Sequence, residues 1–453
     1  MTSTTERHVR KSWVPAVLIL VGFFFSFVNV PLMFGYLAVV ALFLLAAEGQ
    51  IGAIKALVIL TFRSIINPGL AVALDNFGYI KWGAIFVLVG YVLVSAKIHR
   101  PLPRYQGYLI AFAVYAIISS FVTSSYPIVA LLKMISYLVA FWVIMKGVGD
   151  SGGYDWIGYL LTWLVPLTLV SLAMMPFPVA YLRNGVALQG VYNHPNMFGL
   201  MLGITVAASL HKFADNGRLA YLILVVGCFV GGYFSASRTG VIAMAILVAM
   251  FAFSSIRGRS AVKAFAFVGV IMPVLVYATL FSGLANTILA FIYKGGQEDV
   301  LYSREGQIEQ LVSQIVAHPF LGTGFMVPYV PGTVSYGVSF DYIVESGNLV
   351  LALLGGTGIV GTILFVAAYL RIFLDRDRQV PLVIFLAPFV LSMGEMAFFS
   401  TNNIAILYYV LIAYAYGHGA KNGAVALTHS GGGETNVSCE RDRAGLSHRE
   451  VSP

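Results

Sequence analysis

Long apolar runs separated by short polar segments dominate the pattern of this chain. A helix that crosses a bilayer needs roughly 20 apolar residues. The runs predict about fourteen membrane-spanning helices, at Trp13–Val30, Leu32–Ala47, Ile51–Leu74, Gly78–Ser95, Gly107–Val122, Ile128–Met145, Trp156–Met175, Asn196–Leu210, Leu219–Phe234, Thr239–Phe253, Ala264–Phe281, Asn348–Leu370, Val380–Ala397 and Ile404–Tyr416. The third run contains Lys55, Arg63 and Pro68, so two half-helices or an interfacial segment are alternatives there.

Composition agrees with this pattern. Of the 453 residues, 59% are hydrophobic and 10% are charged, and the mean hydropathy is +0.86. A soluble enzyme is excluded, because so few charged side chains cannot solvate its surface. The predicted fold class is an all-α polytopic integral membrane protein.

Basic residues set the predicted orientation in the membrane. His8, Arg10 and Lys11 precede the first run, and with an even number of spans most other basic side chains fall in loops on the same side. Both termini are therefore predicted to be cytoplasmic. The pI of 9.3 reflects these loops and not a nucleic-acid partner. The two cysteines, Cys228 and Cys439, provide neither a disulfide framework nor a metal site.

Four regions follow from this predicted membrane topology. They are N-terminal transmembrane helices (1–281), a large outer loop (282–347), C-terminal transmembrane helices (348–417) and a disordered cytoplasmic tail (418–453). Within the loop, apolar residues recur at helical spacing, and Ser303 and Pro319 mark the two ends of an amphipathic helix. Its predicted apolar face consists of Ile308, Leu311, Val312, Ile315 and Val316.

Arginines at two predicted helix starts suggest an anion site on the outer side. Arg238 follows two serines that can cap an inward-running helix, and Arg304 follows Ser303. Helix N-termini and guanidinium groups both favour phosphate oxygens, so together they suggest a diphosphate. Arg183 is a third candidate ligand. The alternatives are an Arg238 that contacts only lipid headgroups and an Arg304 that is a solvated loop residue.

Four residues are candidate general bases. Asp341 and Glu345 lie one helical turn apart before the span at Asn348, and His194 and His318 each precede a proline. Their alternatives are first-turn acids and structural turn histidines. The glycine run 355–361 lacks the Lys-Ser/Thr of a P-loop, which favours close packing. No cluster of metal-ligand residues is apparent.

Three segments together resemble the O-antigen ligase and polysaccharide polymerase superfamily. Gln189–Gly199 is similar to its Gly-x-x-x-His-Pro-Asn motif, and Ser235–Gly240 is similar to its Ser-x-Ser-Arg-Thr-Gly motif. The third segment runs from Ser303 and Arg304 through His318–Gly324 to Asn348 and Gly361, and it resembles the family's long periplasmic loop and the following span. The resemblance covers roughly the second half of the chain.

This resemblance implies a metal-independent, GT-C-like membrane glycosyltransferase without a cofactor, in the bacterial inner membrane. Its substrate would be a glycan on an undecaprenyl diphosphate carrier at the periplasmic face, with Arg238 and Arg304 holding the diphosphate. His194, Asn196, His318 and Asn348 fall within the matching segments. The lipid bilayer and the carrier-linked glycan are the implied partners, and a chain-length regulator is a further candidate.

Ligases of the superfamily carry a His-Asn pair at the start of the span after the loop. Asn348 fits the asparagine of this pair, but Gly347 occupies the histidine position. The departure favours a polymerase of O-antigen or exopolysaccharide repeat units, and leaves Glu345 and Asp341 as the nearest acids. An O-antigen ligase stays the alternative within this class. A lipid-linked oligosaccharide flippase is the alternative of another class.

Overall fold

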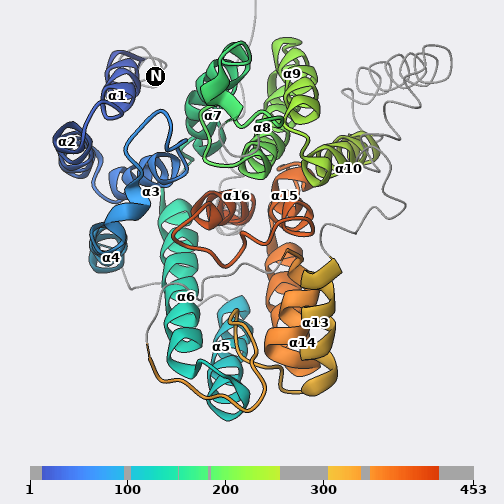
Figure 1. Ribbon diagram of the computed structural model, residues 1–453. Coiled ribbons are helices and arrows are strands. Elements are labelled where there is room, and N and C mark those ends of the chain that lie inside the picture. Colours follow the sequence, from blue (N-terminus) through green and yellow to red (C-terminus); the bar gives the residue numbers. More distant parts are fainter. Residues whose placement is uncertain are drawn as a thin grey trace, which may run out of the picture.

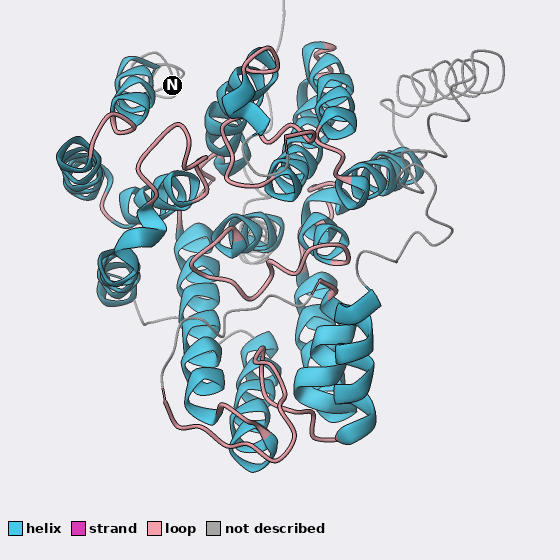
Figure 2. Ribbon diagram, in the orientation of Figure 1, coloured by secondary structure: helices cyan, strands magenta, loops and turns pink. Residues whose placement is uncertain are grey.

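The computed structural model describes residues 13–95, 104–151, 153–181, 185–255, 305–337 and 347–417. Their regular structure is helical apart from one antiparallel bridge between Ile66 and Tyr192 (Figure 2). The all-helical fold predicted from the apolar runs is therefore confirmed. The predicted span Ala264–Phe281 and the predicted tail after residue 417 lie outside the described residues.

The described helices, labelled in Figure 1, are α1 (Trp13–Phe25), α2 (Val30–Glu48), α3 (Gln50–Ser64), η2 (Leu74–Phe77), α4 (Gly78–Ser95), α5 (Arg104–Thr123), α6 (Pro127–Asp150), α7 (Trp156–Ala173), η3 (Pro178–Tyr181), α8 (Pro195–Asn216), α9 (Ala220–Phe234), α10 (Arg238–Ser255), α13 (Glu305–Ala317), α14 (Leu349–Asp375), α15 (Leu382–Ser392) and α16 (Ala405–Gly417).

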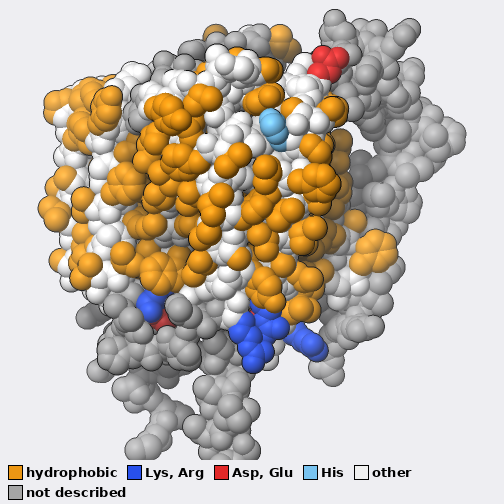
Figure 3. Space-filling model, turned by 90° about the horizontal axis from the view of Figure 1, so that it is seen from below, with side chains coloured by type: hydrophobic (Ala, Val, Ile, Leu, Met, Phe, Trp, Pro, Cys, Tyr) orange, Lys and Arg blue, Asp and Glu red, His pale blue; other side chains and the backbone are white. Residues whose placement is uncertain are grey.

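Several of these helices can cross a bilayer. Among the described residues, seven are long and apolar enough: Val30–Glu48, Leu74–Ser95, Arg104–Thr123, Pro127–Asp150, Trp156–Ala173, Pro195–Asn216 and Leu349–Asp375. Figure 3 shows a broad hydrophobic face with Lys and Arg side chains gathered along one edge, as expected of a lipid-facing surface. The chain is thus a multi-pass helical membrane protein, whereas the total of fourteen spans stays a prediction.

The third predicted span is divided. α3 ends at Ser64, four residues before Pro68, and all its residues from Gly52 onward are buried. The Arg63 guanidinium is enclosed with it and donates to the Ser26 hydroxyl and the Val72 carbonyl. A 15-residue helix buried on all sides belongs to the protein core. Ile51–Leu74 is therefore not one continuous spanning helix.

The centre of the molecule is formed by α8 and α16. In α16, every residue from Ala405 to Ala415 is buried, and the helix contacts α3, α6, α7 and α15. Figure 1 shows α16 in the middle of the helices. α8 is buried along most of its length and contacts α7, α9, α10 and α15. Because these helices are apolar on every side, neighbouring helices must surround them.

The predicted amphipathic helix of the large loop is present as α13, which ends before Pro319 and packs against α14. The predicted apolar face is only partly right: Leu311 is buried, but Val312 and Val316 are 45% and 75% exposed. The buried side also includes Gln314. A Cβ on Gly355 of α14 would lie 2.9 Å from Gln314 Oε1, so a glycine there leaves room for this amide.

A loop strip, residues 318–330, lies between α14 and α5. On the α14 side, the backbone N–H groups of Thr323 and Gly324 donate to the carbonyls of Gly355 and Gly356, at 2.8 and 3.0 Å. On the α5 side, the Thr123 hydroxyl donates to the Gly322 carbonyl at 2.7 Å. The glycine run thus serves close packing, as predicted, although its partner is a loop strip.

α14 is interrupted where the strip binds it. Gly358 has φ +65° and ψ −174°, outside the helical region. The next N–H, that of Ile359, donates to the Pro319 carbonyl at 2.9 Å. In an unbroken helix the Ile359 N–H would have bonded to Gly355. The break therefore frees the Gly355 carbonyl for the strip.

We predict that Gly358→Ala lowers the stability of the purified protein. The left-handed backbone at this position suits glycine, and a Cβ would lie 2.2 Å from the Phe320 carbonyl oxygen. Strain of this kind costs about 1–3 kcal/mol. The midpoint of thermal unfolding in detergent should fall. Gly90→Ala in α4 is the matched control, because a Cβ there meets no atom within 4 Å. Equal midpoints for the two variants would contradict this account.

Candidate functional site

The N-terminus of α8 carries two predicted site residues, His194 and Asn196. His194 Nδ1 accepts a hydrogen bond from the Asn196 backbone N–H at 3.1 Å, and Pro195 occupies the first turn. Both features start a helix at this point. The Asn196 side chain makes a different contact, in which Nδ2 donates to Glu395 Oε1 at 2.5 Å. One short motif thus provides both the cap of α8 and a contact to a distant loop.

The segment before α8 is held against the end of α3. The Asn67 backbone N–H donates to the Val191 carbonyl at 2.8 Å, and its side-chain amide donates to the Gly190 carbonyl at 3.0 Å. Two residues further on, the Asn193 N–H donates to the Ile65 carbonyl at 2.8 Å. The fully buried Asn67 therefore fixes the position of the motif that leads into α8.

Arg238 is the first residue of α10 and is half-buried. A turn with Ala236 at φ +50° precedes it, and the Ser235 hydroxyl accepts from the Ser237 N–H at 3.3 Å. The two serines predicted to cap α10 differ in their contacts, because Ser235 bonds locally whereas Ser237 packs against another helix. Its side chain is buried against Gly199 of α8.

Two motif glycines let α8 and α10 approach each other. A Cβ on Gly199 would lie 2.1 Å from Ser237 Oγ, and a Cβ on Gly240 would lie 3.0 Å from the Gly199 Cα. Larger residues at either position would separate the two helices. The predicted motifs around Asn196 and Arg238 are thus brought together in space.

Asn348 begins α14 and also reaches a neighbouring loop. Its Oδ1 accepts from the N–H groups of Val350 and Leu351, at 3.0 and 3.1 Å, which is an N-cap. Its Nδ2 donates to the Met393 carbonyl at 3.0 Å. Asn348 therefore links the start of α14 to the segment that follows α15.

This segment, Met393–Glu395, is where the N-termini of α8, α10 and α14 meet. Asn348 contacts Met393. A Cβ on Gly394 would lie 2.4 Å from the Cβ of Thr239, the second residue of α10. Asn196 contacts Glu395. Each helix contributes the positive end of its dipole near this segment.

Glu395 was missed by the sequence analysis. It lies inside the predicted span Val380–Ala397, where a carboxylate is unusual. An ionisable residue within an apolar run is itself a signal of function, and this signal was available. In the structure α15 ends at Ser392, so Glu395 stands in the loop beyond it and not within the helix.

His318 lies apart from this convergence. It follows α13, and its ring packs edge-on against Tyr329 at 5.8 Å. The adjacent Pro319 contacts Ile359, about 16 Å further along α14 than Asn348 by the helical rise. The structure therefore brings His194, Asn196, Arg238 and Asn348 together but leaves His318 with the loop strip.

The remaining predicted site residues, Arg183, Arg304, Asp341 and Glu345, lie outside the described residues. In the part of the chain that is described, no group of three or more His, Cys, Asp or Glu side chains could hold a metal ion. The described residues instead provide helix N-termini, one guanidinium group and two amides, beside the Glu395 carboxylate that accepts from one of these amides. Such donors favour an anion with several oxygen atoms, such as a phosphate ester.

Comparison with known families agrees with this class of membrane protein. Residues 222–366 match the family model described as O-antigen ligase, and this range covers about a third of the chain. It contains Arg238 and Asn348, whereas α8 and Glu395 lie outside it. Over this range the chain is similar to O-antigen ligases, and this similarity supports a membrane enzyme of the ligase or polymerase type. No curated protein matches the chain.

We predict that Asn196 and Glu395 are energetically coupled. A hydrogen bond to a charged group contributes about 1.5–3 kcal/mol, so Asn196→Ala and Glu395→Ala should each lower the thermal midpoint. Because both changes break the same bond, the double variant should lose less than the sum of the two losses.

Thr162→Ala is the control for this cycle. The Thr162 side chain is exposed on α7 and bonds only locally, to the Tyr159 carbonyl. Combined with Glu395→Ala, it should give additive shifts. Additive shifts for the Asn196 and Glu395 pair as well would contradict the coupling.

Proposed function

We propose that this protein polymerises oligosaccharide repeat units carried on undecaprenyl diphosphate, at the periplasmic face of the bacterial inner membrane. The observation that carries the proposal is the convergence of the N-termini of α8, α10 and α14, with Arg238 at one of them, on Met393–Glu395. The match of residues 222–366 to the O-antigen ligase family supports a lipid-linked glycan as substrate.

A diphosphate suits this arrangement of charges. Each helix N-terminus carries roughly half a positive charge and Arg238 adds a full one, so the site keeps a positive balance after the Glu395 carboxylate is counted. Arg304 and Arg183 are the further ligands proposed from the sequence. The Glu395 carboxylate, which accepts from Asn196, orients this amide at the start of α8. At the start of α14, the Asn348 amide is oriented in the same way, because its Nδ2 donates to the Met393 carbonyl and its Oδ1 accepts from the Val350 N–H.

The proposed reaction is a single metal-independent displacement. A hydroxyl oxygen of the acceptor glycan bonds to the anomeric carbon of the donor, and the bond from that carbon to the diphosphate oxygen breaks. The hydroxyl proton passes to Glu345, with Asp341 as the second candidate base, and the anomeric centre is inverted. The departing diphosphate keeps the electron pair, and Arg238 and the helix N-termini stabilise its charge.

Sidedness rests on the basic residues at the helix ends. α14 begins at Asn348 in the site and ends beside Arg371, Arg376 and Arg378. With both termini and these arginines in the cytoplasm, the site lies on the periplasmic side. This topology requires an even number of spans along the whole chain, so the divided third run must still provide one crossing.

The closest rival is an O-antigen ligase, which the description of the matching family favours. Gly347 beside Asn348 favours the polymerase, because ligases that the chain resembles have a histidine there. A flippase would need ionisable side chains near the middle of its spans around a cavity. The site described above lies at helix ends, which suits a catalyst at the membrane boundary.

We predict a distinctive glycan phenotype for a strain that lacks this protein. Loss of a polymerase leaves single repeat units on the lipid anchor, because ligation continues without chain growth. Electrophoresis of the extracted glycolipids measures this directly. Long chains retained on the carrier would indicate a ligase instead, and a carrier-linked unit confined to the cytoplasmic face would indicate a flippase.

Complementation of that strain tests the site. The wild-type protein should restore long chains, whereas Arg238→Ala should reduce polymerisation about a hundredfold or more, since one donor to a developing anion contributes about 3–4 kcal/mol. Arg304→Ala should behave alike, and Arg218→Ala, at the other end of α9, should complement fully. Normal chain length with Arg238→Ala at wild-type membrane levels would defeat the assignment.

We further predict that Glu345→Gln lowers turnover while leaving carrier binding nearly unchanged. Proton transfer to a positioned base typically contributes 10²–10⁴-fold, and the amide cannot accept the proton. The measurement compares the rate of chain growth and the affinity for carrier lipid in the purified protein. Glu309→Gln is the matched control, because Glu309 is exposed on α13. Unchanged turnover in Glu345→Gln would eliminate this residue as the base.

A further inference from the structure

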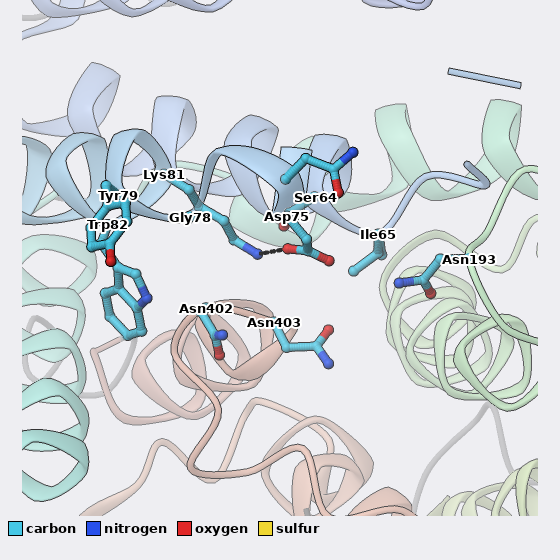
Figure 4. Close-up of a pocket in the computed structure, with 11 residues that line it drawn as sticks. Ser64, Ile65, Asp75, Gly78, Tyr79, Lys81, Trp82, Asn193, Asn402 and Asn403 are labelled. Atoms are coloured by element: carbon cyan, nitrogen blue, oxygen red, sulfur yellow. Dashed lines mark hydrogen bonds and ion pairs between the residues drawn. The ribbon is translucent and has the colours of Figure 1, made fainter. Parts of the chain in front are cut away.

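A polar pocket of about 460 Å³ adjoins the site (Figure 4). Its walls come from the end of α3, from η2 and the start of α4, and from the segments before α8 and α16. The side chains that matter for its chemistry are Asp75, Lys81, Trp82, Asn193, Asn402 and Asn403.

Two walls of the pocket continue directly from the site. Asn193 immediately precedes His194, the cap of α8. Asn402 and Asn403 belong to the same connection between α15 and α16 as Glu395. The wall at the end of α3 is joined to the wall before α8, since the Asn193 N–H donates to the Ile65 carbonyl at 2.8 Å. The pocket therefore shares two chain segments with the site.

Three asparagine side chains provide hydrogen-bonding groups in the pocket: Asn193, Asn402 and Asn403. An amide side chain both donates and accepts hydrogen bonds, so these residues can bind a ligand that carries hydroxyl groups. The sticks of Figure 4 show the amides of Asn402 and Asn403 facing the ion pair of Asp75 and Lys81 across the same space.

The charge of the pocket points to a neutral ligand. Its two charged side chains, Asp75 and Lys81, form an ion pair at 2.7 Å and so offset each other. A second phosphate would find no net positive charge here. Hydroxyl groups, which both donate and accept, match the amides and the ion pair.

An aromatic wall completes the match to a sugar. The Trp82 indole lines the pocket and is stacked on Phe86, at 5.7 Å between ring centroids and 25° between planes, which fixes its orientation. The electron-rich face of an aromatic ring attracts the polarised C–H face of a pyranose. The volume suits roughly one or two sugar rings.

From these features we infer that the pocket is a subsite for neutral sugar residues of the glycan substrate. The inference rests on the proposed function, because it takes the neighbouring helix N-termini as the diphosphate site. The sugars belong either to the donor, next to its diphosphate, or to the acceptor chain.

Titration with free oligosaccharide tests the subsite without carrier or turnover. The probe is the repeat-unit oligosaccharide released by mild acid from the lipids of the deletion strain. It should change the tryptophan fluorescence of the purified protein in a saturable way. Trp82→Phe should abolish the change, whereas Trp142→Phe, in α6 and outside the pocket, should retain it. Absence of a saturable response in the wild-type protein would overturn the inference.

Asn403→Ala gives a second, quantitative measurement. The affinity for the oligosaccharide should fall about tenfold, because one hydrogen bond to the ligand is lost, and the thermal midpoint should be unchanged. Undecaprenyl diphosphate without sugar should bind this variant as it binds the wild type and should bind Arg238→Ala weakly. If only the sugar measurement fails, the subsite is wrong and the proposed function stands. If only the Arg238 measurement fails, the diphosphate site is wrong.

A competition experiment with glycan-bearing carrier shows whether the sugars in the pocket belong to the donor or to the acceptor. When the protein is first saturated with glycan-bearing carrier, a donor subsite is already filled and the free oligosaccharide cannot bind. An acceptor subsite stays open, and the fluorescence titration is unchanged. Either result supports a sugar subsite and identifies which substrate occupies it.

Discussion

The close approach of α8 and α10 at Gly199 and Gly240 is the contact on which the rest of the site depends. Only hydrogen atoms at these two positions allow the backbones to come this near, with the Ser237 side chain filling the space between them. The approach places the start of one helix beside the start of the other. Without it, Arg238 and Asn196 would stand at unrelated helix ends, and no common anion site would form.

The loop strip and the break of α14 show a second use of glycine. At Gly358 the helical hydrogen-bond pattern of α14 is interrupted, and the carbonyls of Gly355 and Gly356 bind the loop strip, which follows α13 and packs against α5. Inside a bilayer an unpaired carbonyl is costly, so irregular backbone is tolerated only where protein covers it. The strip provides this cover, and in return it is held between two helices.

In the proposed function, the site and the polar pocket recognise parts of one substrate that differ in charge. The helix N-termini offer partial positive charges and a guanidinium group, whereas the pocket offers amides, an internally neutralised ion pair and an indole. A lipid-linked glycan has the same division, with its negative charge confined to the diphosphate and neutral hydroxyls beyond it.

Hydropathy along the chain was sufficient to predict a multi-pass helical protein, and the apolar runs placed the starts of α8, α10 and α14 near Asn196, Thr239 and Asn348. These properties are local, since they depend on apolar length and on residues within one helical turn. The division of the third run and the mixed face of α13 depended on packing partners, which a single segment does not reveal. Likewise, Glu395 and the pocket amides became meaningful only when distant helix ends were brought together, because the hydrogen bonds and shared cavity that define them join residues far apart in the chain.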